Sequence, residues 1–393
     1  MVKNFQIKIR RCRGDRKMNA KLRSLFFGGA ALLLAIASVS CGDNAPDLAA
    51  PPLHMPEIRP TFNNMEVLST PDREVSLSTD ELSFRGALNG RVIQKFYEGD
   101  FAELERLAGL YKDGMRTGAG IEKLGPFYWS FMDPMVVDGQ GVDKRVPDLI
   151  SAWADQYPQS PAPYIAMAFM IEEVARQSAR NGATPAVAAF QKRCHDAAFD
   201  YLTQKWELTR NDPYAHGLKI RLIASGASAK ETWQEAFDAA KREHPGRYQI
   251  YFDAVNSAPG ADTSLIKTAA AAEQIARDLA ATMGEDGDIG YARTWWSVSS
   301  RYYGKLLFER GMVDWPRIRN GFYKMIEDYP DPWNVNTFAR FSCIVGDAET
   351  LRILKPAVQE YPIDHIWSHE DREYCLLFAD AQSDFLPKDQ YKQ

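Results

Sequence analysis

Apolar residues recur every three or four positions along most of this chain after residue 78, which is the spacing of a helix with one buried face. The segment "STDE", residues 78–81, is a capping box in which Ser78 and Glu81 can each bond the other's backbone amide. A helix is predicted from there to Glu98, where Gly99-Asp100 interrupts it. The pattern then resumes on a second stripe, so the first unit is predicted to be a helical hairpin; that stripe is Phe101, Leu104, Leu107, Ala108 and Tyr111.

The same hairpin pattern returns later in the chain. "KFYEGDFAELERLA" (95–108) and "SCIVGDAETLRILK" (342–355) share a helix end, a Gly-Asp turn and a second amphipathic helix. Further units are predicted to open with proline in a first helical turn, where its missing amide costs nothing; they are "YPQSPAPYIAMA" from Tyr157, "NDPYAHGLKI" from Asn211, "HPGRYQIYFDA" from His244, "YPDPWNVNTFA" from Tyr329 and "YPIDHIW" from Tyr361.

The spacing of these prolines indicates the fold class. The intervals from Pro213 to Pro245 and from Pro330 to Pro362 are both about 32 residues, close to the roughly 34 of tetratricopeptide units, while other intervals are irregular. The longest strand-like alternation is only "REVSLS", residues 73–78. We therefore predict an all-α protein, a degenerate tetratricopeptide-like stack of helical hairpins (an α-solenoid), over residues 79–393.

The N-terminal region carries a secretion signal. The basic run "KMNAKLR" precedes an apolar run from Leu25 to Val39, too short for a membrane-spanning helix, and the small residues "ASVS" stand directly before Cys41. Residues 1–40 are thus predicted to be a signal peptide, with residues 1–17 a misassigned start ahead of Met18. The pattern resembles a bacterial lipoprotein signal, although Ser38 stands where such signals usually carry an aliphatic residue. The alternative is ordinary cleavage after Ala37, which would release a soluble periplasmic protein.

A lipoprotein signal implies that Cys41 is lipidated, and Gly42 after it favours the outer membrane, facing the periplasm. Two or three acyl chains hold a protein on a bilayer almost permanently. Residues 41–78 are rich in Pro and Ala without helical spacing, which predicts a tether. The formal net charge of -5 over 393 residues argues against a nucleic-acid partner, which requires clustered Lys and Arg.

Five long, aromatic-rich segments carry a family resemblance; they are "FYEGDFAELERLAGLYKDGMRT", "WADQYPQSPAPYIAMA", "YARTWWS", "LFERGMVDWPRIRNGF" and "YPDPWNVNTFARFSCIVGD". They resemble the uncharacterised bacterial family called domain of unknown function 4034, over about Val92 to Phe378. The resemblance implies a helical domain and supplies no reaction, ligand or catalytic residue.

Three cysteines remain beyond the signal. Cys194 shares a helical face with apolar residues, which predicts a buried side chain. Cys343 and Cys375 are about one repeat apart, so they either pair as a disulfide between neighbouring helices or stay as thiols. His365 and His369 have a spacing that can bind zinc, but no third ligand follows from it, and the sequence "GEDGDIG" lacks the calcium-loop pattern. We expect no metal or cofactor.

An aromatic block between residues 291 and 333 is predicted mainly to be core. Two stripes, starting at Trp295 and Trp296, continue at helical spacing to Leu306 and Leu307. A basic ridge, Arg293, Ser297, Arg301 and Lys305, is either a solvated helix face or one wall of a binding groove, because Arg and aromatic residues dominate interface hot spots. The candidate binding surface comprises Arg293, Trp296, Arg301, Trp315, Arg317, Arg319, Trp333 and Asn334.

Three functions follow from these patterns. The main hypothesis is an anchored envelope lipoprotein whose helical domain binds an unidentified envelope protein or peptide. Trp333 and Asn334 are expected to be exposed and to recognise that partner. The alternative is a helical domain that binds a small molecule or glycan. A hydrolase is a third hypothesis, but no nucleophile or phosphate-binding signature is present, no catalytic residue can be named, and an enzyme is not expected.

Overall fold

The computed structural model describes residues 81–135, 143, 145–258 and 265–381. The predicted signal peptide, the predicted lipidation site at Cys41, the predicted tether and the predicted cap at Ser78 all lie outside these residues. None of the described helices combines the length and apolar content needed to cross a bilayer.

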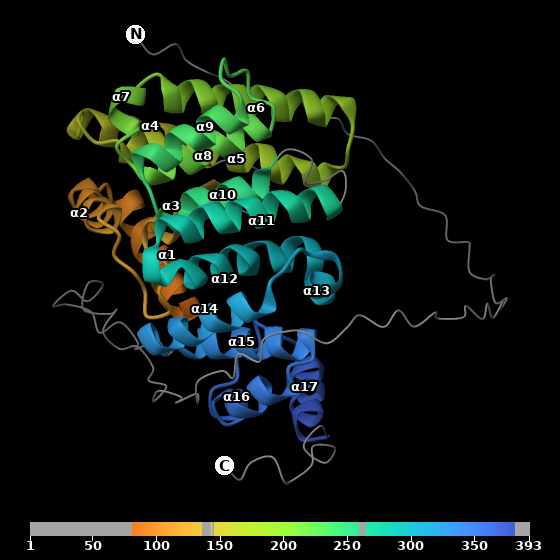
Figure 1. Cartoon of the computed structure of the whole chain (residues 1–393). Helices are drawn as coiled ribbons and strands as arrows, with labels where there is room; N and C mark the ends of the chain where they lie inside the picture. Colours follow the sequence, from red (N-terminus) through yellow and green to blue (C-terminus); the bar gives the residue numbers. More distant parts are fainter. Residues whose placement is uncertain (1–80, 136–142, 144, 259–264, 382–393) are drawn as a thin grey trace, which may run out of the picture. The chain divides into compact units, whose positions relative to one another are not determined.

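Helix is the only extended regular structure in the described part of the chain, where a single bridge between Arg116 and Glu122 is the one strand-like contact. The predicted all-α class is confirmed. The helices labelled in Figure 1 are α1 (Glu81–Glu98), α2 (Phe101–Lys112), α3 (Leu124–Trp129), α4 (Val146–Gln156), α5 (Ala162–Ser178), α6 (Pro185–Thr203), α7 (Trp206–Thr209), α8 (Pro213–Ala224), α9 (Trp233–Glu243), α10 (Tyr248–Ser257), α11 (Leu265–Thr282), α12 (Gly287–Val298), α13 (Leu307–Arg310), α14 (Trp315–Asp328), α15 (Pro332–Val345), α16 (Ala348–Glu360) and α17 (His369–Ala381).

Both predicted Gly-Asp hairpin turns are confirmed. At the α1–α2 turn the Asp100 side chain accepts a hydrogen bond from the Glu103 amide. At the α15–α16 turn Gly346 adopts the left-handed conformation (φ 86°), and Asp347 accepts from the Thr350 amide. A residue with a Cβ is strained at such a φ, whereas an aspartate there satisfies an otherwise unpaired amide of the next helix.

The prediction that proline stands in the first turn of each helical unit is only partly right. Pro213 and Pro332 are the first residues of α8 and α15, where aspartate caps precede them. By contrast, Pro245 lies in the turn before α10, and Pro362 follows the end of α16 at Glu360. α10 starts at Tyr248, whose amide donates to the side chain of Glu122 from a distant segment. Its start is therefore completed by a tertiary contact that no local pattern could reveal.

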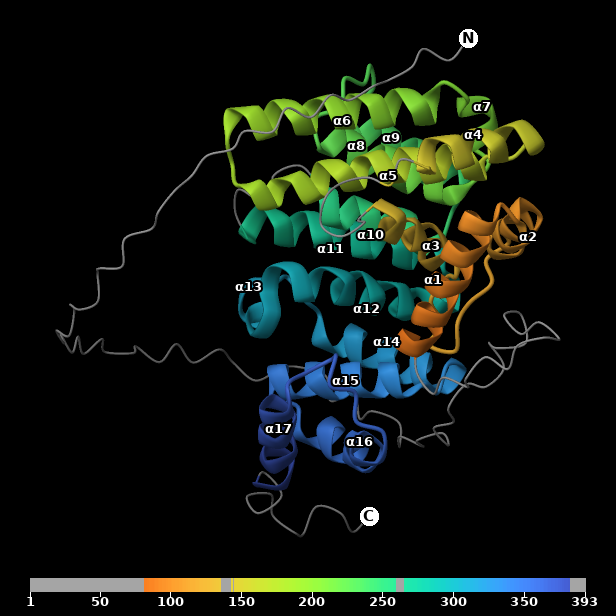
Figure 2. The same cartoon turned by 180° about the vertical axis from the view of Figure 1, so that it is seen from behind.

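Many helices of the described unit pack against helices that are near them in the sequence. α8 contacts both α9 and α10, α10 contacts both α11 and α12, and α12 contacts α14. Figures 1 and 2 show these helices as successive layers that end with α15, α16 and α17. Two hydrophobic clusters fill the interior and meet on α8, where Leu218 and Leu222 face one cluster and Ile220 the other. α8 therefore carries core contacts on more than one face.

The two aromatic stripes predicted from Trp295 and Trp296 do not continue at helical spacing, because a π-helical turn interrupts them. α12 ends at Val298, residues Ser299–Tyr303 form the π-helical turn, and Gly304 has a φ of 52°. Trp295 and Tyr303 are buried as expected, but the changed register leaves Leu306 exposed while Leu307 turns into the core. π-helical turns are rare and concentrate at functional sites.

Candidate functional site

Two residues of the predicted binding surface are buried, which corrects the expectation that they face solvent. The Arg293 side chain on α12 is only 2% exposed, and Asn334 on α15 is fully buried. Burial lowers the pKa of the Arg293 guanidinium. The basic ridge is therefore neither a continuous solvated face nor one wall of an open groove, because α12 ends before Arg301 and Lys305.

The segment before α3 explains this burial. The Ala119 carbonyl accepts hydrogen bonds from Arg293 Nη2 at 2.5 Å and from Asn334 Nδ2 at 3.2 Å. At Gly120, which has a φ of 77°, an added Cβ would lie 2.7 Å from Arg293 Nη2. Backbone can approach the two helices this closely only because residue 120 has no side chain.

The same segment also closes the start of α10. Glu122 accepts from the Tyr248 amide at 3.2 Å and from Arg247 Nε at 3.3 Å. The Arg116 guanidinium lies 4.2 Å from the centre of the Tyr248 ring. A carboxylate at a helix N-terminus is stabilised by the exposed amides and the helix dipole. Residues 116–122 thus contact the starts of α10 and α15 and the middle of α12.

The tryptophans of the predicted surface divide between two places. Trp296 and Trp333 are half-buried and stacked, with ring centres 6.4 Å apart, and Arg85 of α1 lies 5.9 Å from the Trp333 ring. Trp315 instead donates from Nε1 to Asp347 at 3.1 Å. The structure therefore places Trp333 between Arg85 of α1 and Trp296, with both tryptophans partly exposed.

The remaining arginines are not gathered into one site. Arg317 donates from Nε to Asp288 at 3.0 Å, and Arg319 lies 3.7 Å from Asp347. Arg301 is exposed, with its guanidinium 5.2 Å from the Tyr302 ring. Each predicted surface residue contacts a group of its own chain, and only Arg301 among the eight is also exposed, so the eight residues do not form one open surface.

The cysteine and histidine predictions have separate outcomes. Cys343 of α15 and Cys375 of α17 are joined by a disulfide across 32 residues, and Cys194 is buried. His365 lies in the turn before α17 and His369 is its first residue, so the two do not share a helix face. Within the described ranges, no three His, Cys, Asp or Glu side chains converge as metal ligands would.

An unpartnered apolar face lies on α17. Tyr374 and Leu377 are 69% and 67% exposed, far more than a side chain of the core, and Ala381 continues the stripe at the end of the helix. The acidic residues Glu370 and Glu373 are exposed on the same helix. The inner face of α17 is covered by α15 and α16 and tied by the disulfide. Exposed large apolar side chains that lie next to one another often mark an interaction surface.

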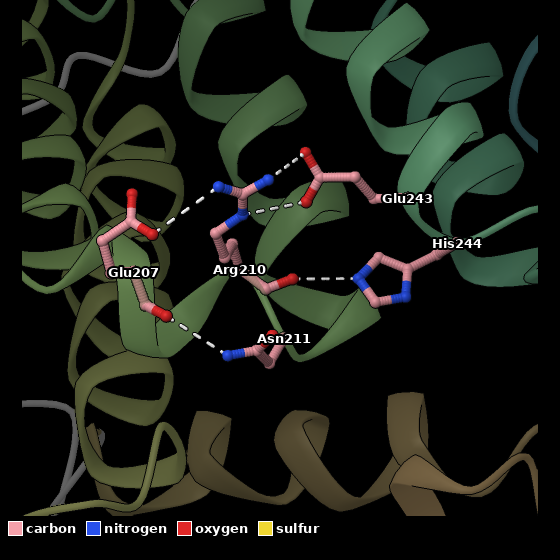
Figure 3. Close-up of a pocket in the computed structure, with 5 residues that line it drawn as sticks. All are labelled: Glu207, Arg210, Asn211, Glu243 and His244. Atoms are coloured by element: carbon pink, nitrogen blue, oxygen red, sulfur yellow. Dashed lines mark hydrogen bonds and ion pairs between the residues drawn. The ribbon is translucent and has the colours of Figure 1, made fainter.

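A polar pocket lies between the α7–α8 turn and the end of α9. It has a volume of about 360 Å³ and is lined by Glu207, Arg210, Asn211, Glu243 and His244 (Figure 3). Arg210 forms a bidentate ion pair with Glu243, in which Nη2 lies 2.8 Å from Oε1 and Nε lies 3.1 Å from Oε2. The hydrogen bonds to Glu243 raise the pKa of Arg210.

Two imidazoles hold the turn behind this pocket. Nε2 of His216 and Nε2 of His244 each lie 2.9 Å from the Arg210 carbonyl oxygen. A carbonyl only accepts, so both Nε2 atoms carry the proton. The His216 side chain is 2% exposed, and the centre of its ring lies 5.0 Å from the centre of the Trp206 ring. Burial lowers the pKa of His216 to about 4.

Glu243 links the imidazoles to the ion pair. Its Oε2 lies 3.5 Å from His216 Nε2. Burial alone would raise the pKa of Glu243, but hydrogen bonds from Arg210 and the nearby His216 bring it below its usual value. No sequence pattern indicates this pocket. Proline marked the turns before α8 and α10, but nothing in the sequence shows that the two turns meet.

Neither protein-family models nor curated proteins nor solved structures give a match to this chain. The resemblance to domain of unknown function 4034 accordingly stays a prediction from the quoted segments.

Proposed function

We propose that this protein is a bacterial envelope lipoprotein, anchored through Cys41, whose helical domain binds a partner protein. The anchor is supported by the apolar run and small residues before Cys41, and the tether by residues 41–78. The resemblance to domain of unknown function 4034 belongs to the same proposal and adds no activity to it.

The proposed architecture is a degenerate tetratricopeptide-like stack. Contacts of one helix with the next one and the next but one, as for α8 and α10, support it. The first residues of α8, α10, α12 and α15 are Pro213, Tyr248, Gly287 and Pro332, and every interval between them exceeds the roughly 34 residues of a regular unit. Stacks of this kind usually bind other polypeptides on extended surfaces.

The outer face of α17 is the single observation that carries partner binding. Tyr374 and Leu377 are the two most exposed of the large apolar side chains in the described part of the chain. A disulfide fixes α17 on α15, so the face is presented by a firmly held helix and needs no ordering on binding. An aromatic anchor on a rigid element suits a protein interface.

The charges beside this face support one kind of partner. Glu370 and Glu373 are exposed on α17, and neither is hydrogen-bonded to another described side chain. A second copy of the chain would bring these carboxylates against their counterparts or against Asp380, which costs free energy. We therefore propose a segment of another protein that carries apolar residues flanked by Lys or Arg.

Site-specific photo-crosslinking in the native envelope tests this proposal. A benzophenone amino acid at Tyr374 is expected to capture one discrete protein, whereas the same group at exposed Gln359 of α16 is the matched control. The adduct is expected to disappear when Glu370 and Glu373 are both changed to Lys, because the charge complementarity is reversed. The captured protein should then bind the purified chain in the same charge-dependent way.

Several outcomes would overturn the proposal. Equal adducts at positions 374 and 359 would show nonspecific proximity, and adducts that survive the double Glu→Lys change would show that the acidic residues do not select the partner. A crosslinked dimer of the protein itself would replace the partner with a second copy. Circular dichroism of each variant separates these outcomes from loss of folding.

A further inference from the structure

Exposed large apolar side chains lie on a second element besides α17. In the described part of the chain they are Leu306, at 37% exposed, and Met312, at 56%. Leu306 directly precedes the short helix α13, and Met312 follows it by one residue. The Gly311 amide donates to the Leu307 carbonyl at 2.8 Å, which closes the turn between them. Leu306 and Met312 therefore stand at the two neighbouring ends of one closed turn.

An ion pair joins this turn to α17. Lys305, directly before Leu306, has its Nζ 2.5 Å from Oδ1 of Asp371 in the first turn of α17. Asp371 and Tyr374 are three residues apart on that helix, so their side chains are neighbours on its surface. Figures 1 and 2 both show α13 and α17 at the same edge of the helical layers, with one end of α15 between them. We call the apolar set the α13–α17 surface; it comprises Leu306, Met312, Tyr374 and Leu377.

Basic groups gather at the α13 side of this surface. Arg301 in the π-helical turn and Arg310 at the end of α13 are both exposed. Arg340 of α15 is half-buried, and burial lowers the pKa of its guanidinium, a shift that the nearby Asp371 opposes. Because Asp371 is already paired, the exposed Glu309 offsets only one of the three guanidinium groups. This side therefore carries an excess of positive charge.

The α17 side carries the opposite charge. Glu370 and Glu373 are exposed on α17 together with the two apolar side chains. Around a helix of 3.6 residues per turn, the order from Asp371 outward is Tyr374, then Leu377, then Glu373. The apolar side chains thus lie between a basic edge at α13 and an acidic edge on α17.

A single amphipathic helix is complementary to such a surface. Its apolar stripe would cover the exposed side chains of both elements, and its polar residues would stand along the two edges of that stripe. Acidic residues along one edge would meet the guanidinium groups, and basic residues along the other would meet the carboxylates of α17. Turning the helix end to end would exchange its edges and bring like charges together, so the charges select one direction of binding.

We propose that the partner binds the α13–α17 surface as an amphipathic helix with basic residues along one edge of its apolar stripe and acidic residues along the other. This inference rests on the proposed partner binding by α17 and adds the second half of the interface. Arg301 and Arg310 contact the acidic edge of the bound helix, and Glu370 and Glu373 contact its basic edge.

Photo-crosslinking at two positions, followed by mapping of the crosslinked peptides, tests the inference. A benzophenone amino acid replaces Tyr374 or Met312 in the full-length protein in its native envelope, and exposed Asn320 of α14 is the control position. Positions 374 and 312 are expected to capture the same protein, at residues of one segment that have the spacing of one helix face. No such adduct is expected from position 320.

Charge reversal at the basic edge provides the second measurement. Changing Arg301 and Arg310 together to Glu is expected to lower the yield of the Met312 adduct about 10-fold or more, because like charges then face each other. Changing Arg180 and Lys230 together to Glu is the matched control, since both are exposed and lie outside α13 and α17. That variant has the same net charge and should keep the adduct.

The outcomes separate this inference from the proposed function. An adduct at position 374 without one at position 312 would overturn the helix that spans both elements, while partner binding on α17 would stand. No adduct at either position would refute both. Captured residues without helical spacing, or a Met312 adduct that survives the charge reversal, would also overturn the inference, and a crosslinked dimer would make a second copy the occupant. Circular dichroism checks that the variants fold, and the peptide mapping itself needs neither charge variant.

Discussion

Replacing His216 with glutamine is expected to remove a large part of the acid sensitivity of folding. The His216 ring is 2% exposed and packs between Trp206 and His244, with ring centres at 5.0 and 4.9 Å. Among the described residues, Glu243 is the one carboxylate within ion-pair distance of this ring, with its Oε2 3.5 Å from His216 Nε2. Burial holds the pKa of His216 at about 4 in the folded chain, so the folded state contains the neutral ring.

The direction of the pH effect follows from the two pKa values. An unperturbed histidine titrates near 6.5, so between about pH 6.5 and 4 the unfolded chain binds a proton that the folded chain does not. The stability from the neutral ring is complete above about pH 6.5 and is lost as the pH falls towards 4. At about 1.4 kcal/mol per pH unit, the wild type should lose about 2 to 3 kcal/mol from this residue between pH 7.5 and 4.5.

Urea unfolding at pH 7.5 and 4.5 measures this loss. A glutamine amide can still donate to the Arg210 carbonyl but cannot take up the proton, so His216→Gln should show a pH-dependent loss smaller by about 2 kcal/mol. Exposed His369→Gln is the matched control and should behave like the wild type. Absolute stability of His216→Gln is not the criterion, because the lost ring also changes packing. Equal pH-dependent losses in the wild type and His216→Gln would refute the reasoning.

Three further predictions concern other parts of the chain. Lys123 is 1% exposed, and burial lowers its pKa to about 8. Lys123→Met should therefore stabilise the protein at pH 7 by about 1 to 3 kcal/mol in urea unfolding. This difference in stability should shrink above pH 8, because the wild-type lysine becomes neutral there. Changing Cys343 and Cys375 together to Ser should cost about 3 to 4 kcal/mol in the chain-entropy model, and a reducing agent should shift the urea midpoint of the wild type but not of the variant. Cys41→Ala should move the protein from the membrane fraction to the soluble periplasmic fraction and abolish labelling by a fatty-acid analogue, whereas unchanged membrane association would contradict the proposed anchor.

The sequence determined the local structure of this protein. Helical periodicity, the Gly-Asp turns at residues 99–100 and 346–347, and the aspartate caps before Pro213 and Pro332 all depend on interactions within a few residues. Such interactions are readable from spacing alone. The all-α class follows from them directly, and the burial of Trp295 follows from its place on an apolar stripe.

The tertiary structure alone decided which polar residues are exposed. Arg293 and Asn334 were predicted to lie on an interface, but both donate hydrogen bonds to the Ala119 carbonyl. These bonds span 174 and 215 residues of sequence. The pocket depends on a meeting of the same kind, because His216 and His244 come together only when the turn before α8 reaches the end of α9. The π-helical turn at Ser299–Tyr303 likewise redirects Leu306 to the surface. Spacing reports the period of one helix, whereas burial of a charged or amide side chain depends on which distant backbone supplies its partner.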